Sequence, residues 1–60
     1  MSAYMIAEDD GPIALWEYKS LDEAVEAAQN KYPGSDVTIY EKGTWNNTRI
    51  GVWRNGNKVG

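Results

Sequence analysis

The chain of 60 residues contains no cysteine and no histidine. Without cysteine it has neither disulfides nor thiolate ligands for a metal ion. Without histidine, imidazole general-base catalysis and the usual zinc sites are excluded. No apolar run approaches the length of a membrane span, and the N-terminus lacks the basic flank and apolar core of a signal peptide. A cytoplasmic protein with no membrane partner is therefore expected.

Motifs of catalysis are missing as well. The sequence has no glycine-rich phosphate loop and no nucleophile with a general base beside it. The pair Asp9-Asp10 lacks the further oxygen ligands that a divalent cation needs, and aspartate suits a turn at this place. We therefore expect a single domain, residues 1–60, that is not an enzyme and that uses no cofactor or metal.

The stretch from Ser20 to Tyr32 predicts the only helix. Ser20 and Glu23 have the spacing of a capping box, in which each side chain bonds a free backbone N–H at the helix start. Pro33-Gly34 ends the helix. Apolar residues at helical spacing form one stripe that faces the core: Leu21, Ala24, Val25, Ala28 and Tyr32.

Strands are predicted on both sides of this helix, at residues 3–8, 13–18, 36–41 and 48–54. Asn55-Gly56 is the strongest hairpin signal in the chain, and the four residues after it either form a strand stub or fray. The predicted fold class is α+β, a two-layer ββαββ arrangement. It has a four-stranded, mainly antiparallel sheet with one helix packed on one face.

Alternation within the strands predicts which side chains the helix covers. The aliphatic phase comprises Met5, Ala7, Ile13, Leu15, Val37, Ile39, Ile50 and Val52. The opposite phase includes Ile6 and is rich in aromatic residues, with an arginine at its margin: Tyr4, Trp16, Tyr18, Tyr40, Arg49 and Trp53. This aromatic face is either a set of cross-strand pairs, with the 42–47 loop bringing Trp45 over it, or a contact surface. Self-association as a homodimer is the simplest occupant of such a surface.

Charge is divided unevenly along the chain. Residues 1–30 carry seven acidic side chains against one lysine, a net charge of −6, whereas residues 31–60 carry five basic side chains against two acidic ones, a net charge of +3. The acidic half is either an ordinary solvated surface or a partner-binding surface. The candidate residues for that surface are Glu8, Asp9, Asp10, Asp22, Glu23 and Glu26.

A second candidate site lies in the basic half. Trp45, Arg49, Trp53 and Arg54 are interspersed with asparagines, as in a stacking platform for single-stranded nucleic acid or nucleotides. The overall acidity opposes direct binding of a polyanion. These four residues therefore define an alternative function, an oligomeric protein that binds a small ligand or nucleotide.

The segment from the second strand to the third resembles the small early proteins with which lytic phages inhibit bacterial RNA polymerase. The residues that carry the resemblance are Ser20-Leu-Asp-Glu-Ala24, Tyr32, Pro33-Gly34 and Val37-Thr38. In that family, arginines on the strand after the helix grip the polymerase jaw. The corresponding strand here has no arginine, so the resemblance does not carry over this mode of binding. Anti-CRISPR proteins share the small size, the acidity and the lack of cysteine.

The first hypothesis is a non-catalytic, phage-like interaction protein that inhibits a host nucleic-acid-handling complex, either RNA polymerase or a CRISPR-type effector. Its acidic surface would occupy a basic groove as a DNA mimic does, and aromatic residues would add affinity. The alternatives are the nucleotide binder and a structural homo-oligomer.

Overall fold

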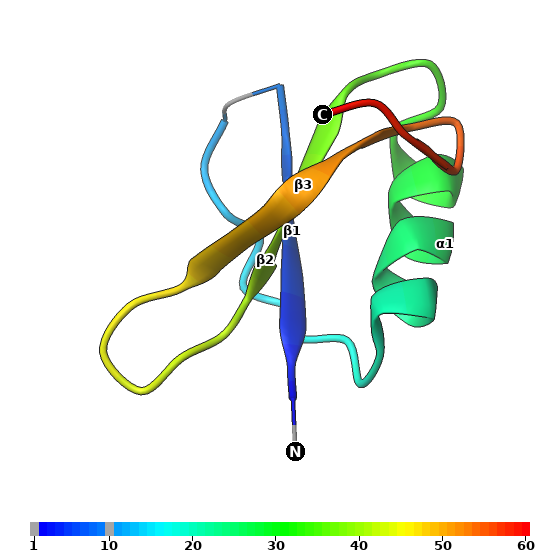
Figure 1. Ribbon diagram of the computed structural model, residues 1–60. Helices are drawn as coiled ribbons and strands as arrows, with labels where there is room; N and C mark the ends of the chain where they lie inside the picture. The colour runs from blue at the N-terminus through cyan, green and yellow to red at the C-terminus, as the bar shows by residue number, and fades with distance from the viewer. Residues whose placement is uncertain (1, 10) are drawn as a thin grey trace.

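The computed structural model describes residues 2–9 and 11–60. Its elements, in chain order, are β1 (Tyr4–Glu8), α1 (Leu21–Lys31), β2 (Val37–Glu41), β3 (Thr48–Arg54) and β4 (Asn57–Lys58). The strands form one antiparallel sheet in the order β1-β2-β3-β4, and α1 packs on one face of it (Figure 1). The expected α+β class, with one helix on a four-stranded antiparallel sheet, is confirmed.

The helix begins at the predicted cap. The Ser20 hydroxyl accepts a hydrogen bond from the backbone N–H of Glu23 at 3.1 Å. The Glu23 carboxylate accepts in return from the N–H of Lys19, one residue earlier than in the usual capping box. At the other end, the Tyr32 N–H donates to the carbonyl of Ala28. Both predicted ends of the helix are therefore confirmed.

The predicted strand at 13–18 is not formed as a strand. This segment runs along the outer edge of β1 and bonds to it at two places, through a bridge between Tyr18 and Tyr4 and through the Ala14 N–H, which donates to the Ile6 carbonyl. Between these two contacts, residues 15–17 form no backbone hydrogen bond to β1, so the pairing is too sparse for a strand. The order of elements is therefore βαβββ rather than ββαββ, and the fourth strand is β4.

Asn55-Gly56 forms the hairpin turn that joins β3 to β4. Both residues have positive φ, 51° for Asn55 and 84° for Gly56, as a two-residue turn of type I′ requires. Of the two outcomes expected for the last residues, the strand stub is the one observed. Val59 and Gly60 continue along β3 by exchanging backbone hydrogen bonds with Val52.

The core lies between α1 and the sheet. Residues paired across antiparallel strands share a face, so Ile6 joins its partner Ile39 on the helix side. Apolar residues of the helix stripe pack against the same cluster, and Leu21, Val25 and Tyr32 cover its margin. The buried members of the cluster are Ile6, Ala24, Ala28, Val37, Ile39 and Trp53.

The expected faces are correct for β2 and wrong for β1. Met5 and Ala7 are buried but lie on the face away from α1, because their partners across the ladder are Tyr40 and Thr38. Both phases of residues 3–8 are apolar, so alternation alone does not choose between them. Pairing with β2 makes the choice, and a register shift of one residue reverses every side chain.

A bulge changes the phase within β3. Gly51 pairs with Ile39 and Arg49 pairs with Tyr40, so Ile50 is an extra residue without a partner. Ile50 packs against the core as expected, but beyond the bulge Trp53 faces the helix and Val52 faces away. The expected order of faces is therefore wrong for Val52 and Trp53.

Candidate functional site

Three acidic side chains of α1, Asp22, Glu23 and Glu26, are exposed in its first two turns. Two physical reasons place them here: carboxylates oppose the positive end of the helix dipole, and Leu21, Ala24 and Val25 take the positions that face the core. A helix fixes the spacing of its backbone positions, so the three carboxylates form a group on one side of α1. We call this group the acidic helix face.

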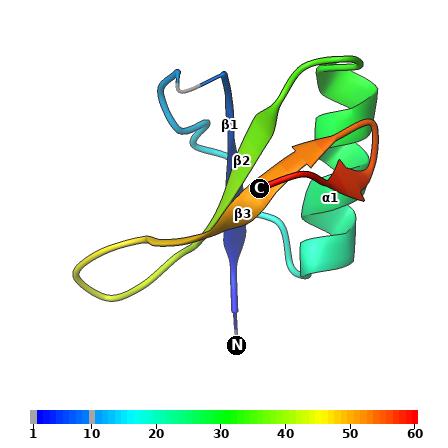
Figure 2. The ribbon, with the colours of Figure 1, turned by 45° about the horizontal axis from the view of Figure 1, so that its top comes forward.

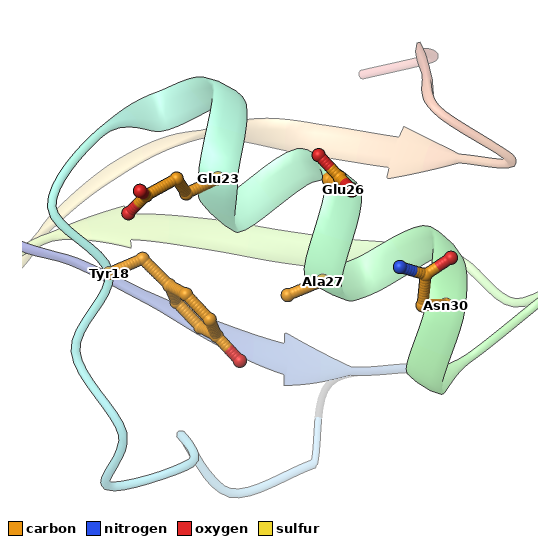
Figure 3. Close-up of a pocket in the computed structure, with 5 residues that line it drawn as sticks. All are labelled: Tyr18, Glu23, Glu26, Ala27 and Asn30. Carbon is orange, nitrogen blue, oxygen red and sulfur yellow. The ribbon is translucent and has the colours of Figure 1, made fainter.

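A shallow hollow of about 320 Å³ adjoins the acidic helix face. Tyr18 lines one side of it, and Figure 3 shows the tyrosine ring beside the helix. Tyr18 is positioned by the backbone bridge to Tyr4, which fixes the chain just before the helix cap. The helix supplies the other lining residues, which recur three and four positions apart along one side: Glu23, Glu26, Ala27 and Asn30.

The carboxylates of this hollow have no basic partner among residues 2–9 and 11–60. The two ion pairs found there, Lys42–Glu17 at 2.7 Å and Arg54–Asp36 at 2.6 Å, involve other acidic residues. The hollow therefore combines unpaired negative charge with an apolar floor at Ala27 and an aromatic ring. Such a lining suits a cationic or amphipathic side chain of a partner. In the described part of the chain, no group of three or more potential metal ligands occurs.

The acidic residues at the turn that follows β1 lie elsewhere. Glu8 and Asp9 are exposed at the far end of β1, where the Asp9 N–H donates to the Asp36 carbonyl. The helix starts beside the near end of β1, at the bridge between Tyr4 and Tyr18. The two ends of β1 are separated by roughly 13 Å at the usual strand rise. Glu8 and Asp9 are thus set apart from the acidic residues at the start of α1, and Asp10 lies outside the described residues.

The expected aromatic face does not form one surface. Trp53 is buried in the core at 8% exposure, and Tyr4 and Tyr18 pack against that core on the helix side. Trp16 is 67% exposed. The strand phases account for Tyr4 and Trp53, and the sparse bonding of the 13–18 segment accounts for Trp16.

Two members of the aromatic set remain neighbours on the face away from α1. Tyr40 is half-buried and pairs across the ladder with the exposed Arg49. Met5 and Thr38, which share this face, are buried. The face is therefore not the open aromatic sheet that the alternation predicted.

The four residues of the alternative ligand site are also dispersed. Trp45 is 91% exposed in the loop before β3, whereas Trp53 and Arg54 lie at the opposite end of that strand. Arg54 donates a hydrogen bond to Asp36, and this bond and its charge lower the pKa of the Asp36 carboxyl and raise that of Arg54. Trp53 is buried and Arg54 is engaged, so neither is available to a stacked base.

Sequence reasoning missed three residues that the structure makes prominent. Leu15, assigned to the core, is 95% exposed, because its segment bonds to β1 at only two places. Ala27 and Asn30 line the hollow, and only their helical spacing from Glu23 indicated that they share its side.

Comparison of the chain with protein-family models, curated proteins and solved structures gave no match. Over residues 2–9 and 11–60, no helix has the length and apolar character needed to cross a membrane.

Proposed function

We propose that the protein is a non-catalytic interaction protein, phage-like in type, that inhibits a host nucleic-acid-handling complex in the cytoplasm. The target is either RNA polymerase or a CRISPR-type effector. The acidic helix face occupies a basic groove that otherwise holds nucleic acid. The observation that carries the proposal is the set of carboxylates on one side of α1 that have no basic partner among the described residues.

The geometry of a helix supports this role. Glu23 and Glu26 are separated by about 4.5 Å along the helix axis, which is comparable to the rise of about 3.4 Å between phosphates of one DNA strand. The capping hydrogen bonds of Ser20 and Glu23 fix the first turn before any partner binds. A preorganised row of negative charge favours fast, salt-dependent association with a basic surface.

The alternative function as a nucleotide binder has less support, because its four residues are dispersed along β3 and its preceding loop. The third hypothesis, a homo-oligomer, has a specific observation in its favour. Leu15, Trp16 and Trp45 are exposed apolar side chains in the described structure. Trp and other large apolar residues are enriched at protein interfaces.

The test of the proposed function is a charge reversal that spares the helix cap. Asp22→Lys/Glu26→Lys changes the charge of the acidic helix face and leaves Glu23 to bond the Lys19 N–H. We expect the wild type to displace labelled DNA from bacterial RNA polymerase or a CRISPR effector and the double variant to lose this effect. Salt should weaken the wild-type effect steeply, because exposed charges are screened.

A charge-matched control is Glu8→Lys/Glu41→Lys, which alters two acidic residues outside the helix. It should displace DNA as the wild type does. Displacement by the Asp22→Lys/Glu26→Lys variant at wild-type concentrations would contradict the proposal, as would failure of the wild type on both complexes. Circular dichroism melts of all three proteins establish that the fold is intact.

A further inference from the structure

The loop and strand start at residues 42–49, here called the hairpin arm, form a second prominent surface. The arm projects from the side of the molecule away from α1 (Figures 1 and 2). Its eight residues are all exposed, and Trp45 is 91% exposed. From residue 42 to the end, the sequence contains four basic residues and no acidic one. The hairpin arm is therefore an aromatic and basic projection.

The hairpin arm has a defined shape. Gly43 lies so close to the carbonyl of Asn46 that a side chain at this position would clash with the backbone. At its base, Lys42 donates a backbone hydrogen bond to the Ala3 carbonyl and pairs with Glu17 at 2.7 Å. Holding the base of the arm reduces the conformational entropy that the arm loses when it binds.

The hollow beside α1 has the complementary chemistry. Its floor at Ala27 and the Tyr18 ring offer apolar and aromatic contacts to an indole, and Glu23 and Glu26 offer charge to a guanidinium. Arg49 follows Trp45 by four residues and forms no ion pair among the described residues. The hollow has a volume of about 320 Å³, at the lower end of the range found for ligand pockets.

The arm does not reach the hollow of its own molecule. The hairpin arm continues directly from β2 and β3, whose ladder holds it on the side opposite α1 (Figure 2). Contact between the two surfaces thus requires two molecules. We propose that the hairpin arm of one copy docks in the hollow of a second copy, with Trp45 against Tyr18 and Ala27 and with Arg49 facing Glu23 and Glu26.

This contact is heterologous, because each copy uses two different surfaces. Each copy keeps a free arm or a free hollow after one contact forms, so assembly continues as chains unless the rotation closes a ring. The assembly also covers Glu23 and Glu26, so self-association and binding of a basic partner exclude each other. The inference does not depend on the proposed function, since it is tested on the purified protein alone.

The experiment is sedimentation velocity over a concentration series, first at low salt. The weight-average sedimentation coefficient of the wild type should rise with concentration and fall when salt is added. Trp45→Ser removes the docking side chain, and Glu26→Arg reverses a charge at the rim of the hollow. Each should lower the association constant at least about tenfold, as loss of a central interface residue does.

Mixing the two variants distinguishes this arrangement from a symmetric dimer. Trp45→Ser keeps an intact hollow and Glu26→Arg keeps an intact arm, so a mixture can form one complete contact and no more. We expect 1:1 heterodimers in the mixture, without longer chains. Leu15→Ser, which removes an exposed apolar side chain outside the arm, should associate as the wild type does.

Three results would overturn the proposal. The first is a wild type that stays monomeric at every concentration up to the millimolar range. The second is a mixture of Trp45→Ser and Glu26→Arg in which no heterodimer forms. The third is association of either single variant as strong as that of the wild type. Because Trp45 and Glu26 are both exposed, the variants should fold, and circular dichroism checks this.

Discussion

Ser20 and Glu23 satisfy two backbone N–H groups that the start of α1 would otherwise leave to water. The Ser20 hydroxyl accepts from Glu23 and the Glu23 carboxylate accepts from Lys19, both at 3.1 Å. These bonds matter to the site as well as to stability, because they fix the turn that carries Asp22 and Glu23.

Ser20→Ala should lower the free energy of unfolding by about 1 kcal/mol, because it removes the acceptor for the Glu23 N–H. In a domain of this size that is a measurable part of the total stability. Urea denaturation measures it, with Ser2→Ala as control, since Ser2 is exposed and outside any element. Coincident curves for Ser20→Ala and the wild type would show that the cap contributes nothing.

The Asp36–Arg54 pair makes stability depend on pH. The hydrogen bond from Arg54 lowers the pKa of Asp36 in the folded protein. A lowered folded pKa means that the stabilisation is present above the unfolded value near 4 and is lost as pH falls through the folded value. The gap in free energy of unfolding between the wild type and Asp36→Asn should therefore be largest near neutral pH. It should disappear in acid.

Thermal unfolding between pH 7 and pH 2 measures this gap. Arg54→Gln removes the other partner and should produce a gap with the same pH dependence. Both side chains are about half exposed, so added salt should reduce the effect. A gap that is constant over the whole pH range would contradict the assignment.

At the scale of elements, the β3–β4 hairpin depends on a turn that few residues can form. Gly56 has φ 84°, and a Cβ there would lie 2.7 Å from the Gln29 side-chain oxygen on α1. Asn55 also accepts a hydrogen bond from the Gly34 N–H, just after the helix. The turn therefore lies against the C-terminal end of α1, near Gln29 and Gly34.

Gly56→Ala should destabilise the protein by about 1–3 kcal/mol, because it forces a residue with a Cβ into left-handed backbone. Gly60→Ala is the matched control, since its Cβ would make ordinary contact with Val52. Urea denaturation compares the two variants. Equal stability of both would mean that the turn relaxes at no cost.

At the scale of the whole molecule, two charged surfaces lie apart in space. The acidic helix face and the basic hairpin arm lie on opposite sides of a body about 31 Å long (Figure 1). Opposite charges on opposite sides favour contacts between molecules rather than within one. A basic partner and a second copy would therefore compete for the hollow beside α1.

The sequence alone determined the local structure. The cap at Ser20, the helix with its stripe from Leu21 to Tyr32, and the turn at Asn55-Gly56 all follow from short-range chemistry that acts within a few residues. The α+β class follows from the alternation of one helix with strand-like segments. The exposed acidic residues Asp22, Glu23 and Glu26 were predictable for the same reason, since the helix period places them away from the core.

Only the tertiary structure decided which residues share a surface. Pairing of Ile6 with Ile39 and the bulge at Ile50 set the faces of β1 and β3, and these are long-range choices that apolar residues in both phases leave open. They buried Trp53, and the sparse bonding of the 13–18 segment exposed Leu15 and Trp16. The hollow exists because Tyr18, which lies outside the helix, packs beside α1. The helical spacing of residues does not specify that contact.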